Sequence, residues 1–436
     1  MGFTATEVCG ALSSVHDFRP RSLLGPPCDS SDSRHRPISK VRETLLPAPV
    51  TVATERQSPM RKLIFALAIV LAVNVETMAQ GLSPSTAQSP STPLVVYAWP
   101  VSGLIDGLAG VDCQPTDWWV RKAVADAFDF LFTPHPELLY HPLLDPNVAP
   151  FVSTVHKARY WRAIDTIRNQ PAPAPGAARV TQFYSSGHVV ETTTMKYSVD
   201  LCEGPFAITP MTPFANPIDP AMVTDIVDKL DIAFFTHLHA DHLSWYVLQE
   251  MAVRGKYVVV TQDIKDIAVA AGAPFANMLI VPQQGVTYTF VSPNPIPGVP
   301  VETLTYTAYN GMQYMGPIGD PTNPYNVQNN GYLINVNSLS IDVTVLDLGD
   351  NNDPGVVSWV AQQIAGGYSP DIVFNLGALW SSINSLGLLA PTRKYLTHAQ
   401  ELTHNPPNFM PLALGSSNNP NRMVLFWGES ETIFLP

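Results

Sequence analysis

The sequence has little cysteine, histidine or charge. Its 436 residues include 4 cysteines and 11 histidines, and charged residues make up 14% of the chain. No two cysteines stand close together, which argues against a structural zinc site held by thiolates. The sequence also lacks a Gly-rich phosphate loop and the Gly-x-Ser-x-Gly turn of serine hydrolases. These absences argue against a P-loop nucleotide site and a serine nucleophile, and they direct attention to the few histidines.

Long hydrophobic runs are also missing. The apolar run at 63–73 has eleven residues, whereas a helix needs about 20 to cross a bilayer. Two basic residues precede this run, and the small residues Thr77 and Ala79 follow it, which is the layout of a secretory signal peptide. We therefore expect residues 60–79 to be removed by cleavage near Ala79. The mature chain would then be exported, to the periplasm or out of the cell, without a stable membrane anchor.

Residues 1–59 show no sustained hydrophobic period. A signal peptide that begins at Met60 implies that translation starts there. We therefore expect residues 1–59 to be disordered or not translated.

Basic charge is scarce in the expected mature chain. Removal of residues 1–79 takes away nine of the 24 basic and seven of the 36 acidic residues, which leaves a net charge near −14. Such a chain repels phosphate backbones, so we expect no nucleic-acid partner. Only Cys113 and Cys202 remain, enough for one disulfide at most, and the sequence leaves their pairing open.

The mature chain is expected to begin with a Ser/Pro-rich linker, residues 80–93, followed by a helical lead-in, residues 94–178. Apolar spacing predicts helices at 117–133 and 153–169, and the Pro-rich stretch 171–177 ends the pattern. This lead-in would serve as a lid, a brace or a contact between copies of the chain. We expect its histidines to be exposed or to cap helices: His135, His141 and His156.

Residues 179–436 read as a mixed α/β domain. Short runs rich in β-branched and aromatic residues, such as 232–236 and 257–261, predict strands. Helical patterns lie between some of them, at 220–230 and at 243–255, and Gly255 closes the second.

Histidines concentrate on one loop of this domain. The stretch AFFTHLHADHLSW, residues 233–245, places four metal-competent side chains within six positions, directly after a predicted strand. They are His237, His239, Asp241 and His242. Imidazoles and a carboxylate at a strand end suit a divalent cation such as zinc. A solvated turn is the alternative, but so dense a cluster is improbable by chance in a chain with so few histidines.

This loop resembles the HxHxDH motif of the metallo-β-lactamase-fold hydrolases, and the resemblance covers most of residues 179–436. It implies a four-layer αβ/βα sandwich, here preceded by the helical extension. It also implies two metal sites, with His237 and His239 in the first and Asp241 and His242 in the second.

Two downstream segments also resemble that family. SIDVTVLDLGDNND resembles the strand that ends in Gly-Asp, whose aspartate bridges both metals, and this role maps onto Asp350. RKYLTHAQELTH resembles the segment that carries the last ligand of the second site. We prefer His398 for that ligand because it directly follows the predicted strand, with His404 as the alternative.

An upstream segment, QFYSSGHVVETTTMKYSVDL, resembles the opening hairpin of the lactonase-like and phospholipase-like branch of the family. The resemblance places His188 near the site, where we group it with the catalytic residues. It maps Asp200 onto an aspartate that supports the loops without binding metal. A surface histidine and a turn-capping aspartate explain the two residues nearly as well.

One expected ligand is missing. The family's third histidine for the first site should lie between the HxHxDH loop and the bridging aspartate, but no histidine occurs from Leu243 to Thr397. The strand ETLTYTAYNGMQY reaches Asn310 at the expected spacing. An amide oxygen is a poorer zinc ligand than imidazole, so we expect a weakened first site.

The predicted function is metal-assisted hydrolysis of a small molecule with an ester, lactone, amide or phosphodiester bond. A bound cation would lower the pKa of a water molecule, Asp241 would orient that water, and Asn310 or Tyr309 would contact the developing oxyanion. Two alternatives stay open. One is a non-catalytic metal-binding module of the same fold, and the other is an exported interaction protein whose lead-in helices bind a partner.

Overall fold

The computed structural model describes one packed unit. Contacts divide the chain into Met1–Lys62 and Leu63–Pro436, and every described residue belongs to the second. The described residues are 149–204, 220–293, 295–337, 342–375, 391–397 and 425–435, with isolated positions 103, 105, 106, 121, 218, 383, 389, 422 and 423. Several predictions lie outside them: the signal peptide, the linker, the helix at 117–133, Cys113, His135, His141, His398 and His404.

The first sheet has seven strands in the order β14-β1-β2-β3-β4-β5-β6. Its neighbours are antiparallel from β14 to β3 and parallel from β3 to β6. The strands are β1 (Ala177–Gln182), β2 (His188–Glu191), β3 (Lys196–Val199), β4 (Ile232–Phe234), β5 (Tyr257–Val259), β6 (Leu279–Ile280) and β14 (Ser430–Phe434).

The second sheet also has seven strands, in the order β13-β12-β11-β10-β9-β8-β7. Its strands are antiparallel from β7 to β10 and parallel from β10 to β13. They are β7 (Tyr288–Val291), β8 (Thr303–Gln313), β9 (Val327–Asn337), β10 (Val343–Asp347), β11 (Ile372–Asn375), β12 (Arg393–Leu396) and β13 (Arg422–Met423).

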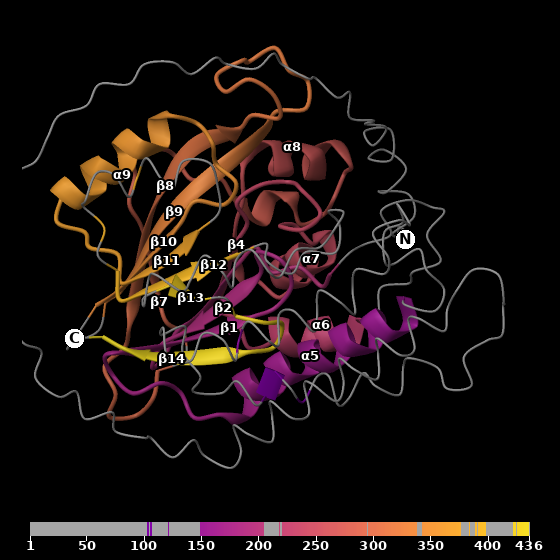
Figure 1. Ribbon diagram of the computed structural model, residues 1–436, viewed down its shortest axis with the longest axis vertical. Helices are drawn as coiled ribbons and strands as arrows, with labels where there is room; N and C mark the ends of the chain where they lie inside the picture. Colours follow the sequence, from indigo (N-terminus) through magenta and orange to yellow (C-terminus); the bar gives the residue numbers. More distant parts are fainter. Residues whose placement is uncertain are drawn as a thin grey trace, which may run out of the picture. The chain divides into compact units, whose positions relative to one another are not determined.

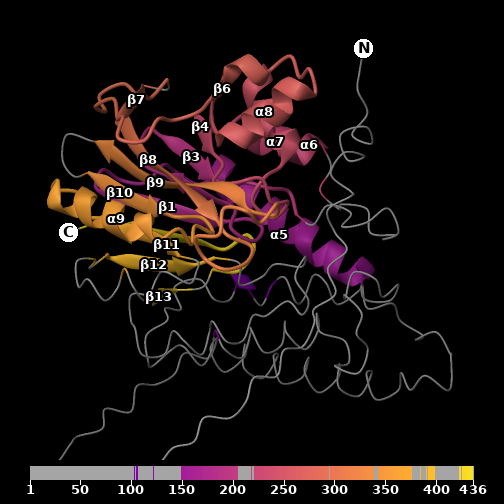
Figure 2. The ribbon, with the colours of Figure 1, turned by 90° about the horizontal axis from the view of Figure 1, so that it is seen from above.

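The two sheets pack face to face, and helices cover their outer faces (Figures 1 and 2). Alternate residues of each strand, such as Tyr197, Phe234 and Tyr332, fill the core between the sheets. The other side of the first sheet packs against α5 (Ala149–Asn169), α6 (Pro220–Val227), α7 (Trp245–Val253) and α8 (Gln262–Ala270). The second sheet packs against α9 (Gly355–Ala365). This helix–sheet–sheet–helix order confirms the predicted sandwich.

The helices follow their sequence patterns. α5 and α7 fall within two to four residues of the predicted spans. Ser244 caps α7, its Oγ accepting a hydrogen bond from Val247 N at 3.0 Å. Gly255 has φ +69 just after the helix, the left-handed conformation that glycine adopts without strain. Among the described residues, no helix has the length and apolar character that a membrane span requires.

His156 differs from its prediction. Instead of being exposed or capping, it is 2% exposed, and its ring stacks on Tyr184 and lies against Trp427. Burial lowers the pKa of His156 to about 3, so the ring is neutral in the folded protein. The helix that carries it adds Tyr160, Ile164 and other residues to the core under the first sheet.

Candidate metal centre

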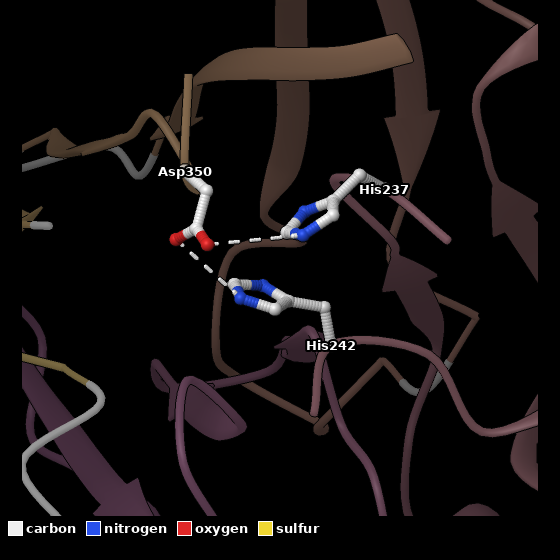
Figure 3. Close-up of side chains that lie close together, drawn as sticks. All are labelled: His237, His242 and Asp350. Carbon is white, nitrogen blue, oxygen red and sulfur yellow. Dashed lines mark ion pairs between the residues drawn. The ribbon is translucent and has the colours of Figure 1, made fainter. Parts of the chain in front are cut away.

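Loops from both sheets meet at one edge of the sandwich. β4 leads into the turn that carries His237 and His242, and β10 leads into the turn that carries Asp350. His237 Nε2 lies 3.9 Å from Asp350 Oδ2, and His242 Nε2 lies 3.5 Å from Asp350 Oδ1 (Figure 3). One ligand atom from each of these residues falls within 4.8 Å of the others. Asp350, which lies 108 and 113 residues after the two histidines in the sequence, therefore converges with them on one point.

The donors fit a divalent cation. His237 and His242 are 0% exposed, and Asp350 is 15% exposed. Two imidazoles and a carboxylate are ligands that transition metals accept, and the buried setting would exclude competing water. These three residues would hold the ion.

Two further residues of the HxHxDH loop border the cluster. Asp241 Oδ2 lies 3.4 Å from His242 Nε2, and Ser185 Oγ donates to the same carboxylate oxygen at 3.5 Å. The ring of half-buried His239 packs edge-on against His237, with centroids 4.7 Å apart. The structure thus brings His237 and His242 together with Asp350, and it places Asp241 and His239 beside these two histidines.

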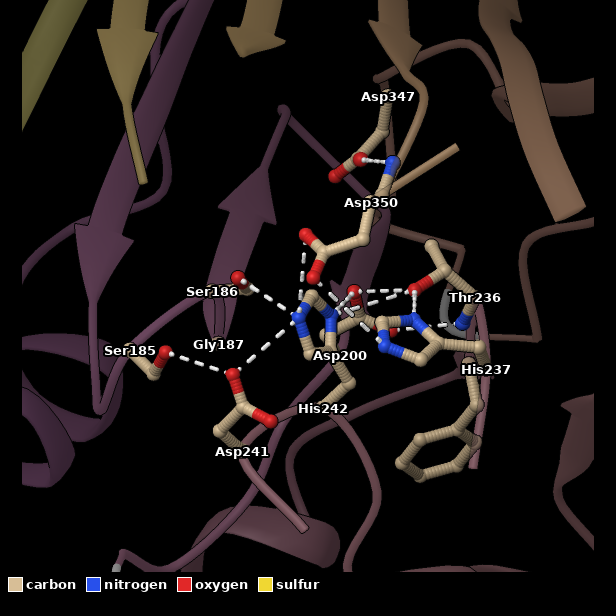
Figure 4. A network of polar contacts seen from close by, with 12 residues as sticks. Ser185, Ser186, Gly187, Asp200, Thr236, His237, Asp241, His242, Asp347 and Asp350 are labelled. Carbon is tan, nitrogen blue, oxygen red and sulfur yellow. Dashed lines mark hydrogen bonds and ion pairs between the residues drawn. The ribbon is translucent and has the colours of Figure 1, made fainter. Parts of the chain in front are cut away.

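Asp200 fixes the orientation of the loop (Figure 4). Its Oδ2 lies 2.7 Å from His242 Nδ1 and accepts from Thr236 Oγ1 at 2.7 Å, while its Oδ1 accepts from Thr236 N at 2.7 Å. A proton on His242 Nδ1 directs the Nε2 lone pair toward the cluster, as a metal-bound histidine requires. Asp200 has φ +51, a strained conformation for a residue other than glycine, and such strain is stored at functional sites.

Charge and burial act against each other at His242. Burial alone would lower its pKa, but the carboxylates of Asp241, Asp350 and Asp200 raise that pKa well above the ordinary value. Without a cation, the ring therefore carries a proton that balances this negative charge. A bound cation would take over that role.

Cys202 supports the loop through a hydrogen bond to its backbone. Among the described residues it is a buried, free thiol, and its Sγ donates to Asp241 O at 3.2 Å. Burial raises the pKa of this thiol well above its ordinary value, so it stays protonated and can donate.

His188 lies behind the cluster rather than in it. Its Nδ1 is 2.6 Å from Ser186 O, its Nε2 is 3.2 Å from Asp347 Oδ2, and its ring stacks on Phe374. Asp347 in turn accepts from Gly349 N at 2.8 Å and so shapes the turn that presents Asp350. The contacts of His188 are those of a positioning residue, which corrects its grouping with the catalytic residues.

The structure also corrects the placement of Asn310. Its side chain is exposed, and its Nδ2 donates to Pro282 O at 2.9 Å. Tyr309 is turned toward the start of α9, where it packs on Trp359 and bonds to Asp353. The amide that does lie beside the cluster is Asn329, whose Nδ2 is 3.2 Å from His237 Nδ1.

Several residues at the site had no sequence signal strong enough to find them. Asn329 and Gln313 approach from β9 and β8, and Gln313 Nε2 donates to Asp350 Oδ2 at 3.0 Å. Ser186 Oγ lies 3.4 Å from His242 Nε2. The sequence pointed to the loop of Ser186 only through the resemblance of its segment to the family's opening hairpin, which was used to place His188 and Asp200.

Comparison with known proteins gives matches among solved structures. No protein-family model matches the chain, and no curated protein does either. Igni18, a metallo hydrolase from the hyperthermophilic archaeon Ignicoccus hospitalis, aligns with 59% of this chain and 98% of its own, with 18% identity and a TM-score of 0.37. A possible metal-dependent hydrolase from Veillonella parvula covers 59% and 99%, with 13% identity and a TM-score of 0.41.

Zn²⁺-bound PqqB from Methylobacterium extorquens aligns with 47% of this chain and 73% of its own, with 12% identity and a TM-score of 0.28. The structural neighbours include metallo-β-lactamase-fold metal-dependent hydrolases.

Proposed function

We propose that the chain is a metal-dependent hydrolase that holds a divalent cation between His237, His242 and Asp350. The observation that carries this proposal is the convergence of two buried histidines and the partly buried Asp350 within 4.8 Å, with Asp200 fixing the tautomer of His242. When bound, such a cation would lower the pKa of a water molecule and would place positive charge beside the bond that is attacked.

The chain's own residues would orient the reaction. Asp241, held by Ser185, lies beside the cluster and is placed to accept a proton from the attacking water. His239 would contribute a further ligand at the half-buried opening of the loop. The substrate is a small molecule with an ester, lactone, amide or phosphodiester bond. From the pattern at 60–79, we also propose that hydrolysis takes place outside the cytoplasm.

The test combines metal content with turnover. The purified full chain should contain at least one divalent cation per molecule and should hydrolyse one of a panel of esters, lactones, amides and phosphodiesters. Asp350→Ala should lose the ion and at least about 10³-fold in turnover, while circular dichroism shows the fold retained. Asp353→Ala is the matched control, since that carboxylate accepts from Gly355 N at the start of α9.

The outcomes separate the alternatives. Bound metal in the wild type with no turnover on any substrate would favour a non-catalytic metal-binding module. Unchanged turnover in Asp350→Ala would eliminate the metal mechanism. Absence of both metal and turnover would favour an interaction protein.

A further inference from the structure

The turn between β1 and β2 brings two serine hydroxyls to the metal centre. Ser185 Oγ donates to Asp241 Oδ2 at 3.5 Å, and Ser186 Oγ lies 3.4 Å from His242 Nε2 (Figure 4). Both serines are buried, with 2% and 3% of their surface exposed. Two buried hydroxyls thus adjoin residues that the proposed reaction uses.

The backbone of this turn is strained and closely held. Gly187 N donates to Tyr184 O at 2.7 Å, which makes Ser185 the first central residue of the turn. Its φ is +48, a conformation that this position normally gives to glycine, asparagine or aspartate. A Cβ atom on Gly187 would lie 2.8 Å from Asp200 O, so the turn presses against the segment that orients His242. Strain that surrounding contacts maintain is concentrated at functional sites, which suggests that the two hydroxyls have a function.

Ser186 lies on the side of the His242 ring that faces the candidate ion. Asp200 Oδ2 lies 2.7 Å from Nδ1, so Nε2 is the nitrogen left for the ion. Asp350 Oδ1 lies 3.5 Å from that Nε2, and Asp241 Oδ2 lies 3.4 Å from it. Three side-chain oxygen atoms therefore surround the one nitrogen that the ion would use, and the oxygen of Ser186 is one of them.

An ion on Nε2 changes what the Ser186 hydroxyl can do. Among the described residues, His242 Nε2 is the one hydrogen-bond partner of Ser186 Oγ. A lone pair that binds an ion does not accept a hydrogen bond, so the hydroxyl proton becomes available to another acceptor. The contacts from Ser186 through His242 to Asp200 have the order of a serine triad, but with the ion on Nε2 the imidazole is no longer a base. Ser186 is therefore a donor and not a nucleophile in the loaded protein.

The proposed reaction needs such a donor. Attack on a carbonyl or phosphoryl group places negative charge on its oxygen, and a fixed donor stabilises that charge. The residues expected from the sequence to make this contact, Asn310 and Tyr309, point elsewhere. Asp241 is placed to accept the proton that the water loses, so the second hydroxyl of the turn is left for the oxygen of the substrate.

We propose that Ser186 is a further catalytic residue, whose Oγ–H donates to the oxygen of the scissile group that gains negative charge. The attacking oxygen forms a bond to the carbon or phosphorus, its proton passes to Asp241, and the electron pair of the C=O or P=O bond moves to the oxygen that Ser186 contacts. As that pair returns, the bond to the leaving group breaks, and Asp241 gives the proton to the leaving group. Ser185 keeps Asp241 in place for both transfers.

This inference rests on the proposed metal-dependent hydrolysis, so the wild type is measured first. The full chain, loaded with Zn²⁺, is assayed on the member of the substrate panel that it hydrolyses best. No turnover on any member would overturn the proposed function together with this inference, before any variant is made. Turnover in the wild type lets the variants test Ser186 by itself.

Ser186→Ala should lower kcat about 10- to 100-fold and change KM by less than about threefold, because the contact strengthens as charge develops. Zn²⁺ affinity, measured by competition with a chelating dye, should stay the same. A second measurement needs no turnover: methylphosphonate, a tetrahedral oxyanion, should bind about tenfold more weakly to the Zn²⁺-loaded variant in calorimetry. The matched control is Ser198→Ala, which removes a buried hydroxyl of β3 that has no partner among the described residues and should change neither quantity.

Ser186→Cys covers the case in which alanine disturbs the strained turn. It keeps the approximate size of the side chain but donates weakly, so it should lose nearly as much activity as Ser186→Ala. Unchanged kcat and methylphosphonate binding in both variants would overturn the assignment of Ser186 while leaving the metal centre intact. Loss of Zn²⁺ affinity along with turnover would also overturn it, because Ser186 would then support the ligands. A covalent adduct on Ser186 after treatment with diisopropyl fluorophosphate would make the residue a nucleophile instead.

Discussion

The two sheets contribute two different halves of the metal centre. Residues after β3 and β4 of the first sheet form a closed network, in which Asp200, Thr236 and His242 are all buried and joined by bonds of 2.7 Å. Residues after β8 and β10 of the second sheet form a network that is less complete. Asp350 is 15% exposed, and the neighbouring amides keep unpaired oxygens.

This difference indicates how the site is assembled. The first-sheet half is positioned by the fold itself, since every orienting bond to His242 Nδ1 is already made. The second-sheet half is less closed, since Asp350 is partly exposed. Folding stability should therefore reside mainly in the first half, and loss of Asp350 from the second should remove the ion with little cost to the fold.

The largest expected effect on stability lies in the first half. Asp200→Ala leaves the buried donors of Thr236 and His242 without their acceptor and should cost about 3 kcal/mol or more. It should also weaken metal binding about 10- to 100-fold. Urea unfolding of the metal-free protein measures the first effect. Asp320→Ala removes an exposed carboxylate that likewise accepts two bonds, from Thr322, and should change the stability little. Equal losses in both variants would contradict the comparison.

A pH experiment tests Glu203 and His156, two buried residues that support the first half. Burial raises the pKa of Glu203 to about 7, despite a hydrogen bond from Ser244, and burial lowers that of neighbouring His156 to about 3. Between pH 7 and pH 4.5 the folded protein takes up a proton at Glu203 that the unfolded chain does not, so this residue adds stability as the pH falls. His156 does the reverse, because the unfolded chain binds its proton below about pH 6.5.

The two contributions are of similar size and nearly cancel in the wild type. Glu203→Gln should leave stability falling by about 2 kcal/mol from pH 7 to pH 4.5, and His156→Gln should leave it rising by about as much. Denaturant midpoints at several pH values, without metal, measure both slopes. Parallel slopes in the two variants would show that these residues do not titrate as described.

The last prediction concerns the contact between the halves. Gly349→Ala places a methyl group against Thr236 of the first half and Asn329 of the second. It should destabilise the protein by about 1–3 kcal/mol. Gly272→Ala is the matched control, because that glycine has a similar φ, +65, and open space around it. Thermal melting of both variants separates the cost of the backbone conformation from the cost of the contact. Equal losses of melting temperature would show that the contact does not constrain this position.

The sequence predicted the first half better than the second. The HxHxDH loop follows one strand and precedes one helix, so local pattern was enough to place His237, Asp241 and His242 together. Asp350 was placed by the resemblance of its segment to the family's strand that ends in Gly-Asp, since that dipeptide alone is common in plain turns. The predicted strands at 232–236 and 257–261 and the predicted helices at 220–230 and 243–255 correspond to β4, β5, α6 and α7, whereas α8 and α9 were not predicted.

What the sequence could not supply was register. β8 and β9 pair so that Asn310 lies opposite Asn330 and Gly311 lies opposite Asn329. That pairing turns Asn310 outward and brings Asn329 to His237, and it is set by a hairpin whose connection, residues 314–326, has no short turn signature. His156 was missed for a similar reason, since its burial depends on Trp427, far away in the sequence.

The pairing of β1 with β14 has a consequence for how the chain folds. Ala177 pairs with Phe434 and Thr181 with Ser430, so the outer neighbour of β1 is supplied by a segment roughly 250 residues later in the chain. Contacts of such long sequence separation slow folding, because the entropy of closing the loop is lost before the contact forms. The first sheet is therefore complete only when residues 430–434 have paired with β1. Delayed closure of this kind would keep the chain in an unfolded, translocation-competent state for longer, as the proposed export requires.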